Sequence, residues 1–190
     1  MTILPEKITI GSRQSPLAKK QVEIFVEKFK EIYGPKMCSI LDFKYLKTSG
    51  DKLLDKNISK FGNKGLFTKE LDQAQLKNEI DVSIHSLKDL PTKINKKLCL
   101  ALVLQREDPR DAIYSVVKKK ISDLKPKNII GTSSIRRAVQ IKRILPNVIL
   151  KQIRGNIDTR INKTIKGEYD AIILAVAGLK RLKIKKFTAL

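Results

Sequence analysis

The chain has 190 residues, of which 42% are hydrophobic and 31% charged, a balance typical of a globular protein with one large domain or two small ones. It lacks both the roughly 18 consecutive apolar residues of a membrane span and the layout of a secretory signal, so we expect a cytoplasmic protein without membrane contact. A net charge of +21 attracts polyanions, yet dispersed lysines and only 5% aromatic residues argue against specific nucleic-acid binding.

The first 46 residues predict a strand, a helix and a second strand. Residues 7–10 (KITI) favour a short strand, and Ser15 followed by Pro16 is typical of a helix N-terminus. Apolar residues then recur every three or four positions until Gly34 and Pro35 end the pattern. Residues 41–45 alternate between apolar and polar, which predicts a half-buried strand.

Residues 48–65 lose this periodicity and predict a long mobile loop. Helical spacing returns at 67–79, residues 80–84 alternate as a strand, and the apolar run 98–104 (LCLALVL) predicts a buried strand. Cys38 and Cys99 lie in apolar runs without metal-ligand spacing, so both are expected to be buried free thiols.

After a charged link near 105–111, strands and helices alternate again. We expect strands near 129–130, 148–153 and 169–176, a helix over 135–145, a helix from Asn156 or Asp158 through Ile165, and a short helix over 178–182. Alternating strands and helices favour α/β architecture with mostly parallel sheets. The sequence therefore predicts two α/β domains, 1–105 and 106–190.

Three polar turns follow predicted strands, at 12–15, 131–134 and 154–156. Because the carboxyl ends of parallel strands share one edge, and helix N-termini there carry unpaired N–H groups, such turns are suited to anions. Several arginines favour a ligand with several carboxylates over a single phosphate. Helix capping is the alternative for each hydroxyl. The side chains in question are those of Ser15, Ser133, Ser134, Arg136, Arg137, Arg154 and Arg160.

Asp89 is the candidate catalytic residue, because a carboxylate at a strand end can stabilise a bound cation and pass a proton to a leaving amine. A turn-capping role for Asp89 is the alternative. His85 is the only histidine, and a hydrogen-bonding role is favoured over a catalytic one. No metal cluster, nucleophile elbow or phosphate loop is present in the sequence.

Motifs spread in order along almost the whole chain resemble the porphobilinogen deaminase (hydroxymethylbilane synthase) family. They are 12–18 (SRQSPLA), 64–71 (KGLFTKEL), 85–89 (HSLKD), 106–112 (REDPRDA), 131–137 (GTSSIRR), 154–156 (RGN) with Thr159 and Arg160, and 169–182 (YDAIILAVAGLKRL). The resemblance implies two periplasmic-binding-protein-like α/β domains that face a cleft. It also implies a monomeric transferase of haem biosynthesis that condenses four porphobilinogen molecules into hydroxymethylbilane and releases ammonia.

The resemblance also implies residue roles. Asp89 matches the catalytic carboxylate that stabilises the cationic azafulvene, and Lys60 and Lys64 fall in a lid loop. Binding of a dipyrromethane cofactor is implied for Lys88, Thr132, Ser133, Ser134, Arg136, Arg137 and Arg154. Binding of the substrate, porphobilinogen or an oligopyrrole polycarboxylate, is implied for Arg13, Ser15, Arg154, Arg160 and Arg181.

The chain departs from the family by ending at Leu190, before the third domain whose cysteine carries the cofactor. Cys38 and Cys99 match no attachment motif, so neither is expected to bear it. Two explanations remain open: a fragment of a full enzyme, or a naturally shortened chain. In isolation the chain is expected to fold poorly or to bind without turnover. Two other functions remain open: a non-catalytic polyanion-binding module, which a carboxylate at position 89 disfavours, and a basic nucleic-acid binder.

Overall fold

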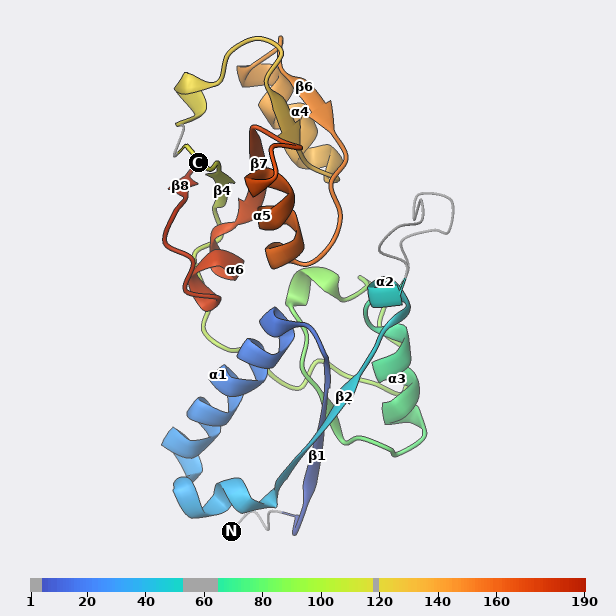
Figure 1. The fold of residues 1–190 in the computed structure, drawn as a ribbon. Helices are drawn as coiled ribbons and strands as arrows, with labels where there is room; N and C mark the ends of the chain where they lie inside the picture. The colour runs from blue at the N-terminus through green and yellow to red at the C-terminus, as the bar shows by residue number, and fades with distance from the viewer. Residues whose placement is uncertain (1–4, 53–64, 118–119) are drawn as a thin grey trace. The chain divides into compact units, whose positions relative to one another are not determined.

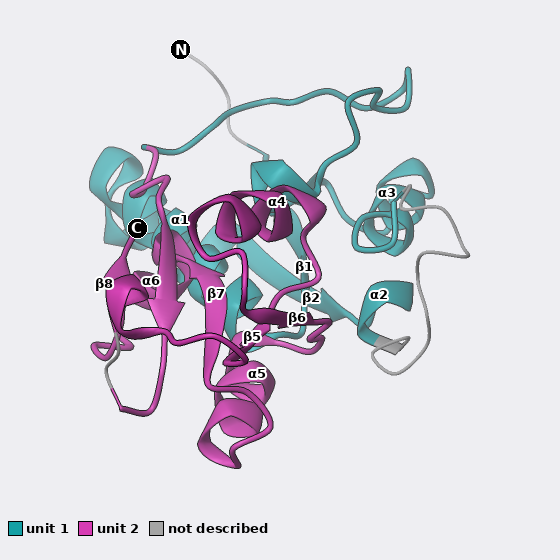
Figure 2. Ribbon diagram, turned by 90° about the horizontal axis from the view of Figure 1, so that it is seen from above, with its two compact units in different colours: residues 1–105 teal, residues 106–190 magenta. Residues whose placement is uncertain are grey.

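The chain folds into two compact units, residues 1–105 and 106–190, in a computed structural model that describes residues 5–52, 65–117 and 120–190 (Figures 1 and 2). Lys60 and Lys64 lie outside the described residues, as does most of the loop expected over 48–65. Among the helices of the described segments, none is long and apolar enough to cross a membrane.

The first unit is built on a parallel sheet with strand order β2-β1-β3. Ile10 of β1 and Leu41 of β2 are buried against Phe29 on the long helix α1, and this cluster is the larger core of the unit. The elements are β1 (Ile8–Arg13), α1 (Pro16–Tyr33), the 3-10 helix η1 (Pro35–Ile40), β2 (Leu41–Leu46), α2 (Ser49–Lys52), α3 (Lys69–Leu76), β3 (Val82–Ser83) and the 3-10 helix η3 (Leu87–Asp89).

The start of α1 confirms its prediction. The Ser15 hydroxyl accepts a hydrogen bond from the backbone N–H of Ala18 at 3.3 Å, and Pro16 occupies the first helical position, where no N–H is needed. The helix ends at Gly34, whose φ of 84° lies in the left-handed region that a side chain disfavours. Pro35 then opens η1, which carries Cys38 in a helical turn rather than in an apolar strand.

One prediction for the first unit is wrong, and another is confirmed only in part. Residues 98–104 form no strand and are mostly exposed, including Cys99, because no neighbouring strand in the described sheet reaches them. The strand predicted over 41–45 is present as β2, but of its alternating apolar residues only Leu41 is buried, whereas Phe43 and Tyr45 are exposed. An apolar pattern indicates which residues can be buried, whereas burial itself needs a partner element.

The second unit contains a five-stranded mixed sheet of order β6-β5-β7-β4-β8. Strands β5, β6 and β7 run parallel, and β4 is antiparallel to both β7 and β8. The elements are β4 (Asp111–Tyr114), the 3-10 helix η4 (Ile121–Asp123), β5 (Ile129–Gly131), α4 (Ile135–Ile144), β6 (Ile149–Lys151), α5 (Ile157–Ile165), β7 (Ala171–Ala175), α6 (Val176–Arg181) and β8 (Thr188–Ala189).

The sequence of strand β7 is a continuous apolar run because the strand is buried on both faces. Ile172 and Leu174 face the cluster that contains residues of α5 and α6, whereas Ala171 and Ile173 face the cluster that contains Ile141 of α4. Because helices cover both faces of this strand, no position in its middle is left for a polar residue. The helices predicted over 135–145 and through 165 are confirmed as α4 and α5, and β4 and β8 were not predicted.

Ile130→Ala is expected to lower the free energy of unfolding by about 2 to 5 kcal/mol, because Ile130 is fully buried and its truncation leaves a cavity. The matched control is Ile135→Ala, at a side chain that is 83% exposed, with an expected change of about 0.5 kcal/mol or less. Urea denaturation followed by circular dichroism measures both, and equal losses would contradict the packing described here.

Candidate functional site

In the first unit, the carboxyl ends of the three parallel strands meet at one edge of the sheet and bring polar side chains together. Strand β1 ends with Arg13, β2 is followed by the short helix α2 that carries Asp51, and β3 leads into His85 and Asp89. The charge of Arg13 acts on both His85 and Asp89, so these three residues, all considered in the sequence analysis, lie in one region.

Arg13 is held by a carboxylate of its own unit. Its Nε and Nη2 atoms donate to the two oxygens of Asp51 at 3.3 and 2.5 Å, and its guanidinium lies 4.3 Å from the ring centre of Phe67. Burial alone would raise the pKa of Asp51, but hydrogen bonds from Arg13 and Thr48 outweigh it and hold that pKa below its usual range. The orientation of the Arg13 guanidinium is therefore fixed by residues of the protein itself.

His85 and Asp89 are both affected by burial, in opposite directions. Burial, assisted by the nearby charge of Arg13, lowers the pKa of His85 from 6.5 to about 4, and the Nε2 atom lies 3.1 Å from the Ser83 hydroxyl. Burial raises the pKa of Asp89, although Lys88 and Arg13 work against it. Among the described residues, none donates a hydrogen bond to the Asp89 carboxylate.

The other predicted residues of this unit have simpler surroundings. Ser15 caps α1, and Lys88 is exposed on η3 beside Asp89. The loop before η3 is tied to α1, because Gln21 and Ser86 exchange hydrogen bonds at 3.0 and 3.2 Å. That tie helps to hold the Lys88–Asp89 turn in place.

In the second unit, the parallel strands β5 and β6 end at two of the predicted anion turns, and the hydroxyls of the first turn are all used internally. Thr132 accepts from the N–H of Ser134 at 3.2 Å, and Ser134 accepts from the N–H of Arg137 at 3.4 Å as the cap of α4. Ser133 donates to the carbonyl of Ile153 at 2.6 Å and accepts from its N–H at 3.2 Å. Ser133 thereby joins the turn after β5 to the turn after β6.

Arg160 lies in the first turn of α5, and two other arginines lie near it. Burial lowers its pKa, and the neighbouring charges of Arg137 and Arg154 lower it further. Its Nε donates to the carbonyl of Gly155 at 2.8 Å. Gly155 has a φ of 111°, and a side chain there would meet Thr159 at 2.7 Å, so this tight turn requires glycine. The three arginines form what we call the arginine cluster: Arg137, Arg154 and Arg160.

Arg136 and Arg137 differ in exposure, at 66% and 14%, and both contact Asp111. Arg137 also donates from Nη1 to the carbonyl of Ile173 at 3.2 Å. The two adjacent arginines predicted to bind a ligand therefore have unequal environments. The Arg137 side chain is largely buried and its orientation is fixed by hydrogen bonds, whereas the Arg136 side chain projects from the surface.

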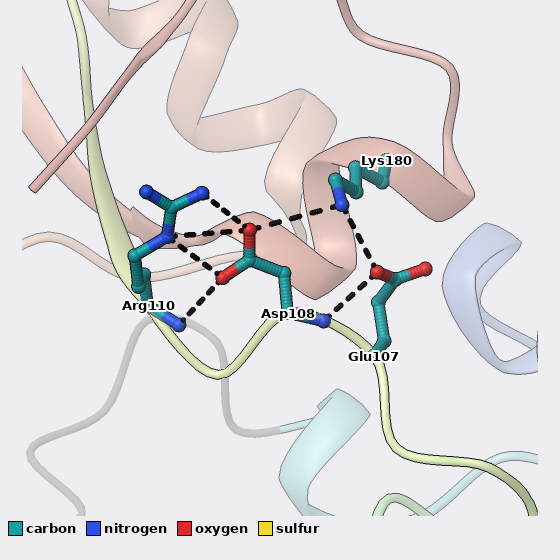
Figure 3. A network of polar contacts seen from close by, with 4 residues as sticks. All are labelled: Glu107, Asp108, Arg110 and Lys180. Atoms are coloured by element: carbon teal, nitrogen blue, oxygen red, sulfur yellow. Dashed lines mark hydrogen bonds and ion pairs between the residues drawn. The ribbon is translucent and has the colours of Figure 1, made fainter.

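Arg181, at the end of α6, is placed near Glu107 rather than in the arginine cluster. Beside it, the Lys180 ammonium lies 3.2 Å from the Glu107 carboxylate and 3.7 Å from that of Asp108, and Asp108 also accepts a hydrogen bond from Nη2 of Arg110 at 2.8 Å (Figure 3). This network fixes the segment that enters β4.

Sequence reasoning did not single out Asp51 and Asp111, the two carboxylates that hold arginines. Asp51 lies in the short helix α2 and Asp111 is the first residue of the short strand β4, and nothing in the local spacing distinguished them from surface charges. The available signal was that acidic residues are scarce, since the chain has 40 basic and 19 acidic residues.

Comparison with known proteins gives a consistent result. The family model described as porphobilinogen deaminase, dipyromethane cofactor binding domain, matches residues 8–189. The porphobilinogen deaminase of Bacillus subtilis is 45% identical over 94% of this chain and 56% of its own length, and that of Acetivibrio thermocellus is 46% identical over 95% and 60%. The chain thus spans little more than half the length of these curated relatives.

Among solved structures, substrate binding domain 2 of Lactococcus lactis GlnP in an open conformation is similar in fold, with a TM-score of 0.50 and 11% identity. The match covers 99% of this chain and 77% of that one. This similarity concerns the α/β fold alone.

The depressed pKa of His85 predicts a pH-dependent stability. Because the unfolded state binds a proton near pH 6.5 and the folded state only near pH 4, stability is complete above pH 6.5 and is lost as the pH falls towards 4. The loss is expected to be roughly 2 to 3 kcal/mol. His85→Gln is expected to remove this pH dependence in urea denaturation series.

Since His85 is the only histidine, its ring proton resonances in an NMR titration need no assignment. A midpoint near 4 is expected. A midpoint near 6.5 would mean that the imidazole is solvated, which would contradict its burial.

Proposed function

The chain belongs to the porphobilinogen deaminase family, and from this premise we propose that it binds pyrrole polycarboxylates and takes part in the condensation of porphobilinogen into hydroxymethylbilane with release of ammonia. The observation that carries this proposal is the arginine cluster at the strand ends of the second unit. Arg160 is partly buried beside two other positive charges, and no carboxylate of the described part of the unit pairs with it, so it is suited to a ligand that brings carboxylates.

The energetic argument is that Arg160 is placed where its own charge is unfavourable. A guanidinium that is partly withdrawn from water and lies near two other arginines destabilises the empty protein. Ligand carboxylates would remove that repulsion and form charge-assisted hydrogen bonds, each worth on the order of 1.5 to 3 kcal/mol. A site that is costly when empty and favourable when filled is expected of a binding function.

The same chemistry fits the dipyrromethane cofactor, because each of its pyrroles carries acetate and propionate side chains. We propose that its carboxylates are held by the arginine cluster together with Arg136, and that Thr132, Ser133 and Ser134 shape the turn which presents these arginines. When bound, the cofactor supplies the pyrrole end onto which further pyrroles are joined. We propose that neither the half-buried Cys38 nor the exposed Cys99 carries it.

We propose Asp89 as the acid-base residue. Burial favours its protonated form, so it can donate a proton to the departing amine of porphobilinogen. As a carboxylate it can then stabilise the positive charge left on the pyrrole, and take up the proton that is released when the new carbon-carbon bond forms. Lys88 and Arg13 lie near enough to act on Asp89 electrostatically, and we propose that they and Ser15 orient substrate carboxylates.

We further propose that the protein acts in the cytoplasm as a monomer, with porphobilinogen and oligopyrrole polycarboxylates as its ligands. Arg181 remains a proposed substrate contact. Its charge acts on Glu107 in this structure, and substrate carboxylates would compete with Glu107 for that charge.

Arg160→Gln is expected to have opposite effects on binding and stability. The affinity for porphobilinogen, measured by isothermal titration calorimetry, should fall at least about tenfold, because a charge-assisted contact is lost. The free energy of unfolding without ligand should stay the same or rise by up to about 1 kcal/mol, because a buried like charge is removed. The control is Arg143→Gln, at an exposed arginine in the last turn of α4, with little change in either quantity.

If Arg143→Gln weakened binding as much as Arg160→Gln, the affinity would come from general positive charge, as in a nonspecific polyanion binder. A steep fall of affinity with salt, together with effective competition by DNA, would point the same way.

Asp89→Asn is expected to reduce single-turnover ammonia release from porphobilinogen by about a hundredfold or more, since general acid catalysis contributes on that scale. The affinity for porphobilinogen should change less than about threefold. Asp42→Asn, which removes an exposed carboxylate of the same unit, is the control and should leave both quantities unchanged. Unaltered ammonia release by Asp89→Asn would remove Asp89 from the catalytic assignment.

A further inference from the structure

We propose that Asp111 is a positioning residue of the second unit, whose carboxylate fixes the directions of Arg136 and Arg137 before any ligand binds. This inference rests on the proposed function, because it assigns to Asp111 the preparation of the site for a polycarboxylate. It concerns a residue that the ligand is not required to touch.

The backbone of Asp111 is held by the sheet rather than by a loop. Asp111 is the first residue of β4 and pairs with Ala175 of β7, and its carbonyl accepts the N–H of Leu190 at 2.8 Å. The preceding carbonyl, of Arg110, accepts the N–H of Val176 at 3.0 Å. Strands on both sides therefore set the position of the carboxylate, which is 15% exposed.

Arg137 is bound to Asp111 by a two-point fork. Its Nε donates to Oδ2 at 3.0 Å and its Nη2 donates to Oδ1 at 2.5 Å, while Nη1 donates to the carbonyl of Ile173. All three guanidinium nitrogens therefore have a partner, and the plane of the group is fixed relative to β4 and β7. Such bidentate pairs have a defined geometry that a single contact lacks.

Arg136 reaches the same carboxylate from the neighbouring helical position. Adjacent helical residues point about 100° apart, so a shared partner is not expected from α4 alone. The Nη2 of Arg136 lies 3.3 Å from Oδ2 of Asp111, while the side chain stays 66% exposed. Asp111 thus draws the two diverging arginines towards one point and leaves Arg136 with donors facing solvent.

Because Asp111 is negatively charged, a positioning role and a purely electrostatic role predict opposite effects of its removal on anion binding. Asp111 neutralises Arg137, which is one of the two charges that lower the pKa of Arg160. Removing a carboxylate near an anion site raises the positive potential, so a bystander acid would make anion binding tighter when replaced by an amide. A positioning residue predicts the reverse, because the arginines lose their direction.

The experiment compares Asp111→Asn with the unsubstituted chain in calorimetric titrations with porphobilinogen and with citrate. We expect Asp111→Asn to weaken the binding of both probes at least tenfold. The matched control, Asp123→Asn, removes a carboxylate from the same unit that holds no arginine in the structure, and should bind equally well or slightly more tightly. In the NMR spectrum, the Arg137 Nε–H signal should be protected from exchange with solvent in the unsubstituted chain and lose this protection in Asp111→Asn.

Equal or tighter binding by Asp111→Asn, while the unsubstituted chain binds, would overturn this inference and leave the proposed function intact. Failure of the unsubstituted chain to bind either probe would overturn both. If the Asn variant does not fold, Asp111→Glu tests the inference, since it keeps the charge but shifts the carboxylate by one methylene. At least threefold weaker binding is expected for Asp111→Glu, and unchanged affinity would overturn the proposed positioning role.

Discussion

A guanidinium that is withdrawn from water must find a carboxylate or a carbonyl, and this requirement organises both units. In the first unit Asp51 holds Arg13, and in the second Asp111 holds Arg137, each through two nitrogen atoms of the arginine. Each pair lies at the end of a strand. The cost of burying the two charges is offset only by good geometry, which the sheet supplies. The strand ends are therefore rigid as well as polar.

Against these balanced pairs, Arg160 stands out because the described part of the second unit provides no carboxylate for it. Arg160 is partly buried, has Arg137 and Arg154 as neighbours, and donates to the carbonyl of Gly155. The total charge of +21 says little about this arrangement, because most lysines are dispersed over the chain. Local imbalance, rather than net charge, distinguishes an anion site from a basic surface.

Hydroxyls and arginines have separate tasks in the second unit. Thr132, Ser133 and Ser134 hydrogen-bond to backbone atoms and so shape the turn between β5 and α4. The guanidinium groups carry the charge that a polycarboxylate recognises. Asp89 of the first unit differs from both the hydroxyls and the arginines. Burial raises its pKa, and no described group donates a hydrogen bond to it. An acid in that condition is suited to proton transfer.

The sequence alone determined the alternation of strands and helices, the cap of α1 at Ser15, and the ordered motifs that indicate the family. These features depend on residues close together in the chain, where spacing and propensity decide the outcome. It also named Asp89 and the arginines as candidates.

Tertiary structure decided what each charged group faces. No local pattern indicates that residues 98–104 lack a partner strand, that Asp111 reaches both Arg136 and Arg137, or that Arg160 lies among like charges. Burial and pairing depend on residues tens of positions away, and pairwise energies between such groups arise only when the sheet brings its strand ends together.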